Sequence, residues 1–361
     1  MAARIVLHIG PRKTATTYLQ RCLVKLTRRG VIDPSVYPLN SREKDDHNHV
    51  PGMIDLLRTY DQIPLQDDAW RHLDGQAASA LIDHARQASG PVIFSAEAVA
   101  ATRLAGARTV IAAFAPAEIT VVITARPVGR VLPSSWAQHV RNGNIETLES
   151  YLDLRRAERA QMATLETRPD HAFWRSYAYG HLVRRWRSAG ARVVVATVPS
   201  HPSDPSEMWR RFVAATGLTD VLPADPPRIS DAKANASLSL DQSLAIQGFN
   251  ETARAAGQDR RWTRREHRRM LRHGLRSDPE QALQDGIPEH LHEPVQQWQF
   301  DDANDLSVTG VETVGDLADL TATPKPAPSD DEMITALTDT VGRGLLGMQA
   351  MHATSDESVD S

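Results

Sequence analysis

The sequence is poor in cysteine and has no long apolar run. Cys22 is the only cysteine among 361 residues, so no disulfide can form within the chain and a cysteine-rich zinc site is excluded. The apolar run near the N-terminus is too short for a signal peptide, and no later stretch approaches the length of a membrane span. We therefore expect a cytoplasmic protein of a reducing compartment, with no membrane span.

The sequence also lacks a strong charge of either sign. Its formal net charge is −4, from 41 Lys and Arg against 45 Asp and Glu, so nothing global attracts the chain to nucleic acid or to an anionic membrane. Any anion site must therefore be local. One basic stretch, residues 260–276, has arginines at helical spacing. It fits a solvated helix face, or a contact for an anionic acceptor or a nucleotide phosphate.

Apolar, β-branched runs alternate with helical patterns in the first two thirds of the chain. The runs expected to form buried strands are residues 4–9, 91–95, 119–125 and 192–198. The helical patterns between them cover residues 16–26, 76–88, 104–114, 128–140 and 177–189. This alternation predicts an α/β fold with a parallel β-sheet flanked by helices. Ligands of such sheets bind beyond the carboxyl ends of the strands.

The rest of the chain predicts helices without strands. After about Pro223 the strand pattern ends, and residues 241–256 and 263–273 are expected to be helices that cover the sheet or close the site. Residues 324–329 form a proline-rich break before a helical pattern over 330–348. We predict one α/β domain over residues 1–323, helical from about 223, and a separate segment over 324–361 with a disordered acidic end.

The first strand run leads into a short loop rich in basic and hydroxyl residues, and then into a helical pattern. Residues 8–20 read HIGPRKTATTYLQ. The first N–H groups of a helix lack partners and the helix dipole is positive there, so this loop is suited to bind an anion. It does not match the Walker A pattern, which disfavours a nucleoside triphosphatase. The alternative is an ordinary strand-to-helix connection in which threonines cap the helix.

A second basic motif follows the third strand run. Arg126 stands at the end of that run, and Ser134 follows eight positions later in a helical pattern. A guanidinium fork suits a phosphate, and Ser134 lies about two helical turns further on, with a hydroxyl for the same group. In the alternative interpretation Arg126 is a surface ion-pair partner and Ser134 is an ordinary helix residue.

The two motifs together resemble those of sulfotransferases that use 3′-phosphoadenosine 5′-phosphosulfate (PAPS), in the extended form of bacterial members. The family's donor loop usually reads Pro-Lys-Ser/Thr-Gly-Thr-Thr, and its 3′-phosphate motif has the spacing of Arg126 and Ser134. The similarity covers most of residues 4–320, although only these two motifs are specific. The resemblance implies a P-loop-like fold and transfer of a sulfuryl group to a hydroxyl or amine of a carbohydrate, glycolipid or small metabolite.

The resemblance also implies which residues bind the donor. They are Arg12, Lys13, Thr14, Ala15, Thr16, Thr17, Arg126 and Ser134. Lys13 would contact the bridging oxygen of the phosphosulfate, and the threonines with their amides would hold the 5′-phosphate. Ala15 replaces the usual glycine, which matters if that position needs a positive φ, and Arg12 replaces the usual residue before the lysine. No metal is expected, since cations and helix amides already hold the leaving phosphate.

The catalytic base is expected from one of two places. Glu97 follows the second strand run directly, so it should project at the carboxyl edge of the sheet. Its position resembles that of the catalytic histidine in cytosolic relatives, although it equally fits an early-helix carboxylate that complements the dipole. His47 and His49 compete, because an unperturbed histidine titrates near neutrality. We rank Glu97 first and His49 second, and interpret the segment around the histidines as a solvated loop more readily than as a metal site.

Two other functions fit parts of the pattern. A kinase or other phosphotransferase on a related P-loop sheet would need ATP and magnesium, but no strand run ends in a Walker B-like aspartate. A non-catalytic adapter that kept the fold and lost the donor would fit Ala15. For the sulfotransferase we expect a small-molecule or glycan acceptor as the partner and no nucleic acid.

Overall fold

The structure is a computed structural model, and its contacts divide the chain into two compact units. It describes residues 2–39, 49–59, 73–168, 171–200, 204–229, 238–273, 275, 283 and 286–342. Unit 1 comprises residues 1–128, 157–235 and 297–322, and unit 2 comprises residues 129–156, 236–296 and 323–361. The domain limits expected from the sequence stay a prediction, and the predicted acidic end lies outside the described residues.

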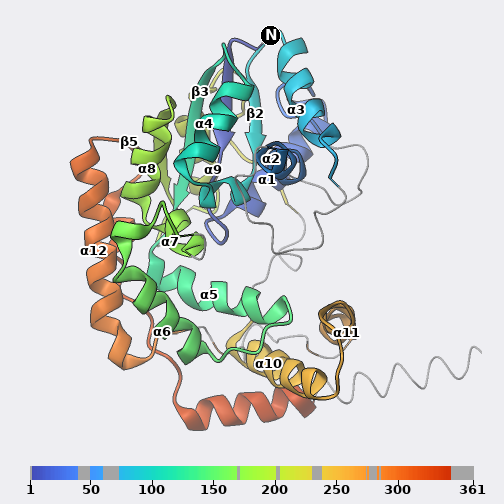
Figure 1. Ribbon diagram of the computed structural model, residues 1–361, viewed down its shortest axis with the longest axis vertical. Helices are drawn as coiled ribbons and strands as arrows, with labels where there is room; N and C mark the ends of the chain where they lie inside the picture. Colours follow the sequence, from blue (N-terminus) through green and yellow to red (C-terminus); the bar gives the residue numbers. More distant parts are fainter. Residues whose placement is uncertain are drawn as a thin grey trace, which may run out of the picture. The chain divides into compact units, whose positions relative to one another are not determined.

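Unit 1 is built on a five-stranded parallel β-sheet. Its strands are β1 (Arg4–His8), β2 (Val92–Ser95), β3 (Glu118–Ala125), β4 (Arg192–Thr197) and β5 (Glu312–Val314). Their order across the sheet is β2-β1-β3-β4-β5, and all neighbours are parallel. The sheet and its flanking helices confirm the predicted α/β class (Figure 1). The four predicted strand runs correspond to β1 to β4.

The strands differ in how clearly the sequence predicts them. β3 is buried from its second residue to its last, and a strand that is covered on both faces forms a continuous apolar run. β5 has only three residues, of which Glu312 is exposed and the other two are half-buried. It lies at the edge of the sheet. The expectation that no strand follows Pro223 is therefore wrong for β5.

Helices cover both faces of this sheet. The helices of unit 1 are α1 (Thr16–Arg28), α2 (Val50–Thr59), α3 (Gln76–Gln87), α4 (Leu104–Ala113), α7 (Ala172–Tyr177), α8 (Tyr179–Ser188) and α9 (Glu207–Thr216). One core joins α1 and α9 through Leu23 and Phe212 to the face of the sheet that carries Val6 and Ile93. Phe94, on the opposite face, contacts Phe114 at the end of α4.

The helix predicted over residues 177–189 corresponds to α8, which begins at Tyr179 directly after the separate helix α7. Ala178, with φ −81° and ψ 83°, separates α7 from α8. Tyr177 and Tyr179 flank this break, and the hydroxyl of each donates to backbone outside its own helix, to Arg12 and to Arg126 respectively. The break therefore belongs to the support of the sheet edge, which a helical pattern does not reveal.

Unit 2 is helical. It contains α10 (Leu240–Ala255), α11 (Arg260–His273), a further helix over residues 330–342, and most of α5 (Val128–Arg141) and α6 (Leu148–Arg159). Helix α12 (His292–Thr309) begins in unit 2 and ends in unit 1. The helical patterns predicted over 128–140 and 241–256 are confirmed, and α11 begins three residues before the predicted 263.

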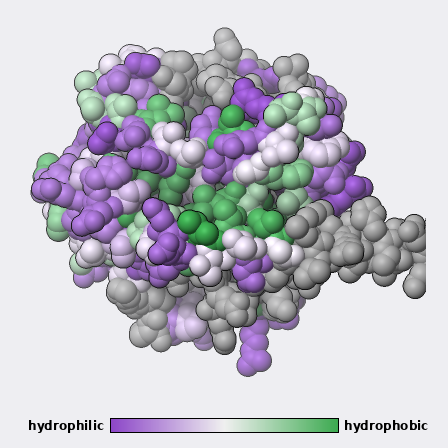
Figure 2. Space-filling model, turned by 90° about the horizontal axis from the view of Figure 1, so that it is seen from below, coloured by the Kyte–Doolittle hydropathy of each residue, from purple (hydrophilic) through white to green (hydrophobic). Residues whose placement is uncertain are grey.

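Polar side chains, drawn purple, cover much of the surface shown in Figure 2, with a smaller hydrophobic area drawn green. No helix within the described residues is both long and apolar enough to cross a membrane.

Candidate active site

The carboxyl ends of β1, β2 and β3 lie at the same edge of the sheet in unit 1. His8, the last residue of β1, pairs with Ser95 of β2 and with Val122 of β3. The chain passes from β1 to β2 on one side of β1 and returns to β3 on the other. Parallel sheets bind their ligands at such a switch point. The β1–α1 loop, residues 9–15, and Arg126 after β3 both follow strands that meet there.

Four consecutive carbonyl groups of the β1–α1 loop accept hydrogen bonds from side chains. The donors to the carbonyl oxygens of residues 10, 11, 12 and 13 are, in order, Thr16 (3.0 Å), Thr14 (2.6 Å), Tyr177 (2.7 Å) and Arg126 (3.0 Å). They come from α1, the loop itself, α7 and the end of β3. The carbonyl groups of residues 10–13 are therefore already used in hydrogen bonds within the protein.

The backbone N–H groups that follow are in a different state. Among the residues that the structure describes, none accepts a hydrogen bond from the backbone N–H of Thr14, Ala15, Thr16 or Thr17, and the first bond of this turn joins Leu19 N–H to Ala15 O at 3.1 Å. Unpaired N–H groups and the positive end of the helix dipole favour an anion. The start of α1 can therefore bind a phosphate.

Two residues of this loop have a left-handed backbone. Lys13 has φ 69° and Ala15 has φ 66°, a region that costs a residue with a Cβ atom about 1–2 kcal/mol. The position where the family pattern has glycine thus does take a positive φ, and alanine is strained there. Such strain persists where the surroundings over-determine the conformation, as the four bonded carbonyls do here.

The side chains of the loop divide into exposed and buried sets. Arg12 and Thr17 are exposed, Lys13 is half-buried, and Thr14 and Thr16 are buried. Each of the two buried threonines donates its single hydroxyl hydrogen to a loop carbonyl. They therefore offer a ligand their backbone N–H groups and not their hydroxyl hydrogens.

Arg126 is fixed on both its backbone and its side chain. Its N–H donates to the Tyr179 hydroxyl at 2.9 Å, and that hydroxyl donates to Arg126 O at 2.8 Å. Burial raises the pKa of Tyr179 above its usual range, so the phenol stays neutral. The guanidinium Nη1 donates to Lys13 O at 3.0 Å. Arg126 thus links the end of β3 to the β1–α1 loop.

Ser134, the predicted companion of Arg126, lies on α5 in unit 2. Its hydroxyl donates within the helix to Arg130 O and Val131 O, each at 3.1 Å. This is the usual bonding of a serine inside a helix. Its assignment to a 3′-phosphate stays a prediction.

Glu97 lies where the sequence predicts it, directly after β2. It begins the short helix η2 (Glu97–Ala101), and its side chain is half-buried. Its Oε2 accepts a hydrogen bond from Gln20 Nε2 at 3.2 Å, and the same nitrogen donates to Ser95 Oγ at 3.0 Å. Helix α1 therefore contributes a contact to Glu97 as well as the N–H groups of its first turn.

Sequence reasoning missed the supports of η2. The carbonyls of Ala100 and Ala101 accept hydrogen bonds from the buried side chains of Arg185 (3.3 Å) and Arg175 (2.8 Å). Arg185 also pairs with Glu166 at 2.6 Å. The available signal was an arginine in the apolar stripe of each of two helices.

The sequence suggested that His49 lies on a loop that faces the site, but the structure places it elsewhere. It is buried, its Nδ1 accepts from Ser95 N–H at 2.9 Å, and its Nε2 donates to Pro38 O at 2.9 Å. Burial lowers its pKa to about 4. Since both ring nitrogens are bonded, His49 supports the end of β2 and is not placed to act as a base. His47 lies outside the described residues.

No group of three or more His, Cys, Asp or Glu side chains that could hold a metal ion occurs in the described parts of the chain.

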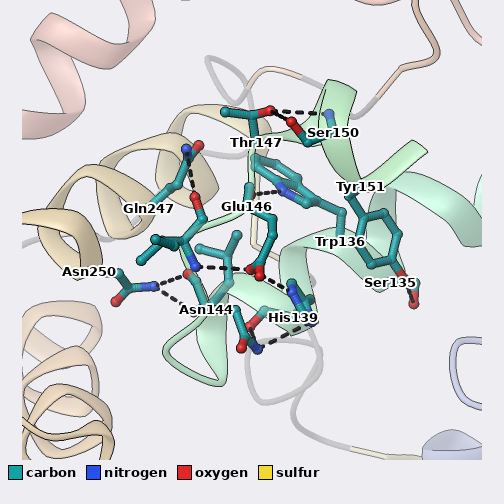
Figure 3. A network of polar contacts seen from close by, with 12 residues as sticks. Ser135, Trp136, His139, Asn144, Glu146, Thr147, Ser150, Tyr151, Gln247 and Asn250 are labelled. Carbon is teal, nitrogen blue, oxygen red and sulfur yellow. Dashed lines mark hydrogen bonds and ion pairs between the residues drawn. The ribbon is translucent and has the colours of Figure 1, made fainter. Parts of the chain in front are cut away.

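Unit 2 contains a separate polar network around the turn between α5 and α6 (Figure 3). Asn250 of α10 donates to Val140 O at 2.9 Å and to Asn144 O at 2.7 Å, and Gln247 donates to Ile145 O at 3.2 Å. These contacts tie α10 to the turn.

The basic stretch forms α11 and contributes to the same turn. Arg260 donates to Asn144 Oδ1 at 2.9 Å, and Arg264 donates to Asn142 O at 3.1 Å. Arg261, by contrast, is exposed. Part of this helix therefore has a structural role in unit 2. The sequence had suggested only a solvated helix face or a contact for an anion.

Comparison with known proteins gives a distant likeness to a solved structure. No protein-family model matches the chain, and no curated protein matches it. Among solved structures it is similar to the crystal structure of a sulfotransferase from Alicyclobacillus acidocaldarius, with 16% sequence identity and a TM-score of 0.39. The match covers 72% of this chain and 98% of that one. A likeness of this size leaves the function to be argued from the residues above.

Proposed function

We propose that the chain is a sulfotransferase that transfers the sulfuryl group of PAPS to a hydroxyl or amine of an acceptor. The β1–α1 loop carries the proposal. Its carbonyls at residues 10–13 are all bonded, whereas the N–H groups of residues 14–17 have no acceptor among the described residues. A loop with this polarity at a helix start suits a nucleotide phosphate. The motif resemblance supports phosphosulfate over other phosphates.

The donor would be bound by residues of the loop and of β3. PAPS, when bound, supplies an activated sulfuryl group on a phosphate leaving group. The N–H groups of residues 14–17 would hold the 5′-phosphate, and the Lys13 ammonium would stabilise the charge that develops on the leaving oxygen. Arg126 would hold the 3′-phosphate, a group to which the motif resemblance also assigns Ser134. Arg12, which is exposed within the loop, adds a cation.

Glu97 is the catalytic base in this proposal. An acceptor hydroxyl must lose its proton as it attacks, and a carboxylate at the same sheet edge as the loop can take it. The hydrogen bond from Gln20 fixes one carboxylate oxygen. The other competitor with described side chain atoms, His49, has both ring nitrogens bonded. Lys13, in the loop after β1, would thus stabilise charge, and Glu97, directly after β2, would take the proton.

Calorimetric titration with two nucleotides tests the proposal. Micromolar binding of adenosine 3′,5′-bisphosphate, with little response to ATP and magnesium, is the expected result. The reverse preference would replace the sulfotransferase by a kinase. Binding of neither nucleotide would indicate the adapter, and the strained Ala15 would then be a reason for the lost donor site.

A further inference from the structure

A chain of buried polar side chains runs from Glu97 to the β1–α1 loop. Its members come from α1, β2, β1, β3 and the loop, and each is at most 3% exposed. In order they are Gln20, Ser95, His8, Thr124 and Thr14. The successive distances are 3.0 Å from Gln20 Nε2 to Ser95 Oγ, 2.9 Å from Ser95 Oγ to His8 Nδ1, 3.4 Å from His8 Nε2 to Thr124 Oγ1, and 2.7 Å from Thr124 Oγ1 to Thr14 Oγ1.

The hydrogens at the Glu97 end of this chain have one consistent arrangement. An ionised Glu97 only accepts, so the Gln20 atom that faces it is the amide nitrogen. Gln20 then donates to Ser95 Oγ. Ser95 has one hydroxyl hydrogen, and its remaining partner is His8 Nδ1. His8 therefore accepts at Nδ1 and carries its proton at Nε2.

The same direction continues to the loop. His8 Nε2–H faces Thr124 Oγ1, and the Thr124 hydroxyl donates a hydrogen bond to Thr14 Oγ1. Thr14 in turn donates to Pro11 O at 2.6 Å. Each hydroxyl accepts once and donates once, so no buried hydrogen lacks an acceptor.

Gly10 leaves the room that this chain needs. A Cβ atom at that position would lie 1.8 Å from Thr124 Oγ1 and 2.7 Å from His8 Nε2. The glycine that opens the loop is therefore required by the contact between β1 and β3, at a φ that other residues also adopt.

We propose that His8 is a positioning residue: held as the neutral Nε2–H tautomer, it orients Thr124 and Thr14 and so fixes the loop that carries Lys13. The consequence for nucleotide binding rests on the proposed function, whereas the tautomer is a property of the chain alone. A second proton on Nδ1 would face Ser95, which already accepts from Gln20 and would lose the acceptor of its own hydrogen. Burial lowers the pKa of His8 to about 3, in agreement with a neutral ring.

Nitrogen-15 spectroscopy of histidine-labelled protein tests the tautomer directly. The ring signals of His8, assigned by their loss in His8→Asn, are expected to show an Nε2–H neutral ring that does not titrate between about pH 5 and 8. A proton on Nδ1, or titration in this interval, would overturn the proposal. This measurement needs no nucleotide.

Two substitutions at His8 test the positioning. Gln places an amide nitrogen near the position of Nε2 and keeps a donor to Thr124, whereas Asn reaches only the position of Nδ1. For adenosine 3′,5′-bisphosphate we expect an approximately tenfold loss of affinity in His8→Asn, about one hydrogen bond, and less than about a threefold loss in His8→Gln. The exposed His290→Asn serves as the matched control. Equal losses at His8 would contradict the proposal.

A pair of variants at Thr124 covers the case in which His8→Asn does not fold. Thr124→Val keeps the shape and removes the hydroxyl, and Thr124→Ser restores it. We expect about a tenfold loss of affinity for the valine variant and recovery for the serine variant. Unchanged affinity in Thr124→Val would exclude a role of the chain in the loop. If the wild-type protein binds no nucleotide, the proposed function fails, and the tautomer measurement still decides the hydrogen-bond chain.

Discussion

Ala15 has a backbone conformation that favours glycine, with φ 66° and ψ 7°. The motif resemblance predicted that the sign of φ at this position matters, because the family pattern has glycine there. The answer required the structure, since an alanine in a right-handed first helical turn has the same sequence. The bonds that hold the loop carbonyls come from residues far away in the chain, such as Tyr177 and Arg126, and no local pattern announces them.

Ala15→Gly is expected to stabilise the protein by about 0.5–1 kcal/mol. The substitution removes a left-handed alanine, which costs about 1–2 kcal/mol, and part of the gain is lost to the greater freedom of glycine in the unfolded chain. Urea unfolding measures it. Ala80→Gly, at an exposed position inside α3, is the control and should lose about 1 kcal/mol. Destabilisation of the same size at both positions would contradict the strain at Ala15.

Lys13→Ala is expected to lower the rate of sulfuryl transfer by about two to three orders of magnitude, because one donor to the leaving oxygen is lost. The midpoint of thermal unfolding should stay close to that of the wild type. Transfer is measured as release of adenosine 3′,5′-bisphosphate from PAPS with an acceptor found by screening. Arg28→Ala, at the other end of α1, is the control for loss of a cation. A Lys13 variant as fast as this control would remove the lysine from the mechanism.

At the scale of elements, the sequence predicts those that are buried on both faces. β1 to β4 stand out because covered parallel strands need apolar residues at every position. β5 is short and partly exposed, and tertiary contacts hold it to the sheet. Asp319, which follows it in the short helix η6 (Leu317–Thr321), accepts from Thr197 at 3.0 Å and from Arg211 at 2.5 Å. It also accepts from Ser200 N–H at 2.9 Å.

Asp319→Ala is expected to destabilise the protein by about 2–3 kcal/mol, because it leaves the largely buried Arg211 without this acceptor. Urea unfolding provides the measurement. The control is Glu312→Ala, which breaks an exposed pair with Arg192 at 2.5 Å between β4 and β5. That pair should contribute about 0–1 kcal/mol. Equal effects of the two substitutions would show that burial of the Asp319 network does not matter.

At the scale of the whole molecule, buried groups set the dependence of stability on pH. Burial lowers the pKa of His8 to about 3 and that of His49 to about 4. Below about pH 6.5 these histidines bind protons in the unfolded chain but stay neutral in the folded protein, so the free energy of unfolding falls as the pH falls. Burial raises the pKa of Asp302 to about 6, although Arg159 lies 2.8 Å away. This group acts with the opposite sign, because its stabilisation is lost as the pH rises from about 4 to 6.

The slope of the unfolding free energy against pH tests these assignments. Between about pH 6 and 5, His49→Gln should make the acid loss shallower by at most about 1.4 kcal/mol per pH unit, the effect of one whole proton. Asp302→Asn should make it steeper. The slope is the readout, because either substitution also changes hydrogen bonds and so the absolute stability. His290→Gln, which alters an exposed ring, should leave the slope unchanged, and a His49 variant with the same slope as this control would contradict the neutral buried state.

The proposed function depends on where a nucleotide phosphate binds to the chain. A crystal structure of the complex with adenosine 3′,5′-bisphosphate measures this directly. We predict that the oxygens of the 5′-phosphate lie about 2.7–3.2 Å from the backbone nitrogens of residues 14–17, with the Lys13 ammonium on the same phosphate. A 5′-phosphate bound away from the β1–α1 loop, with those N–H groups still unpaired, would contradict the proposed function.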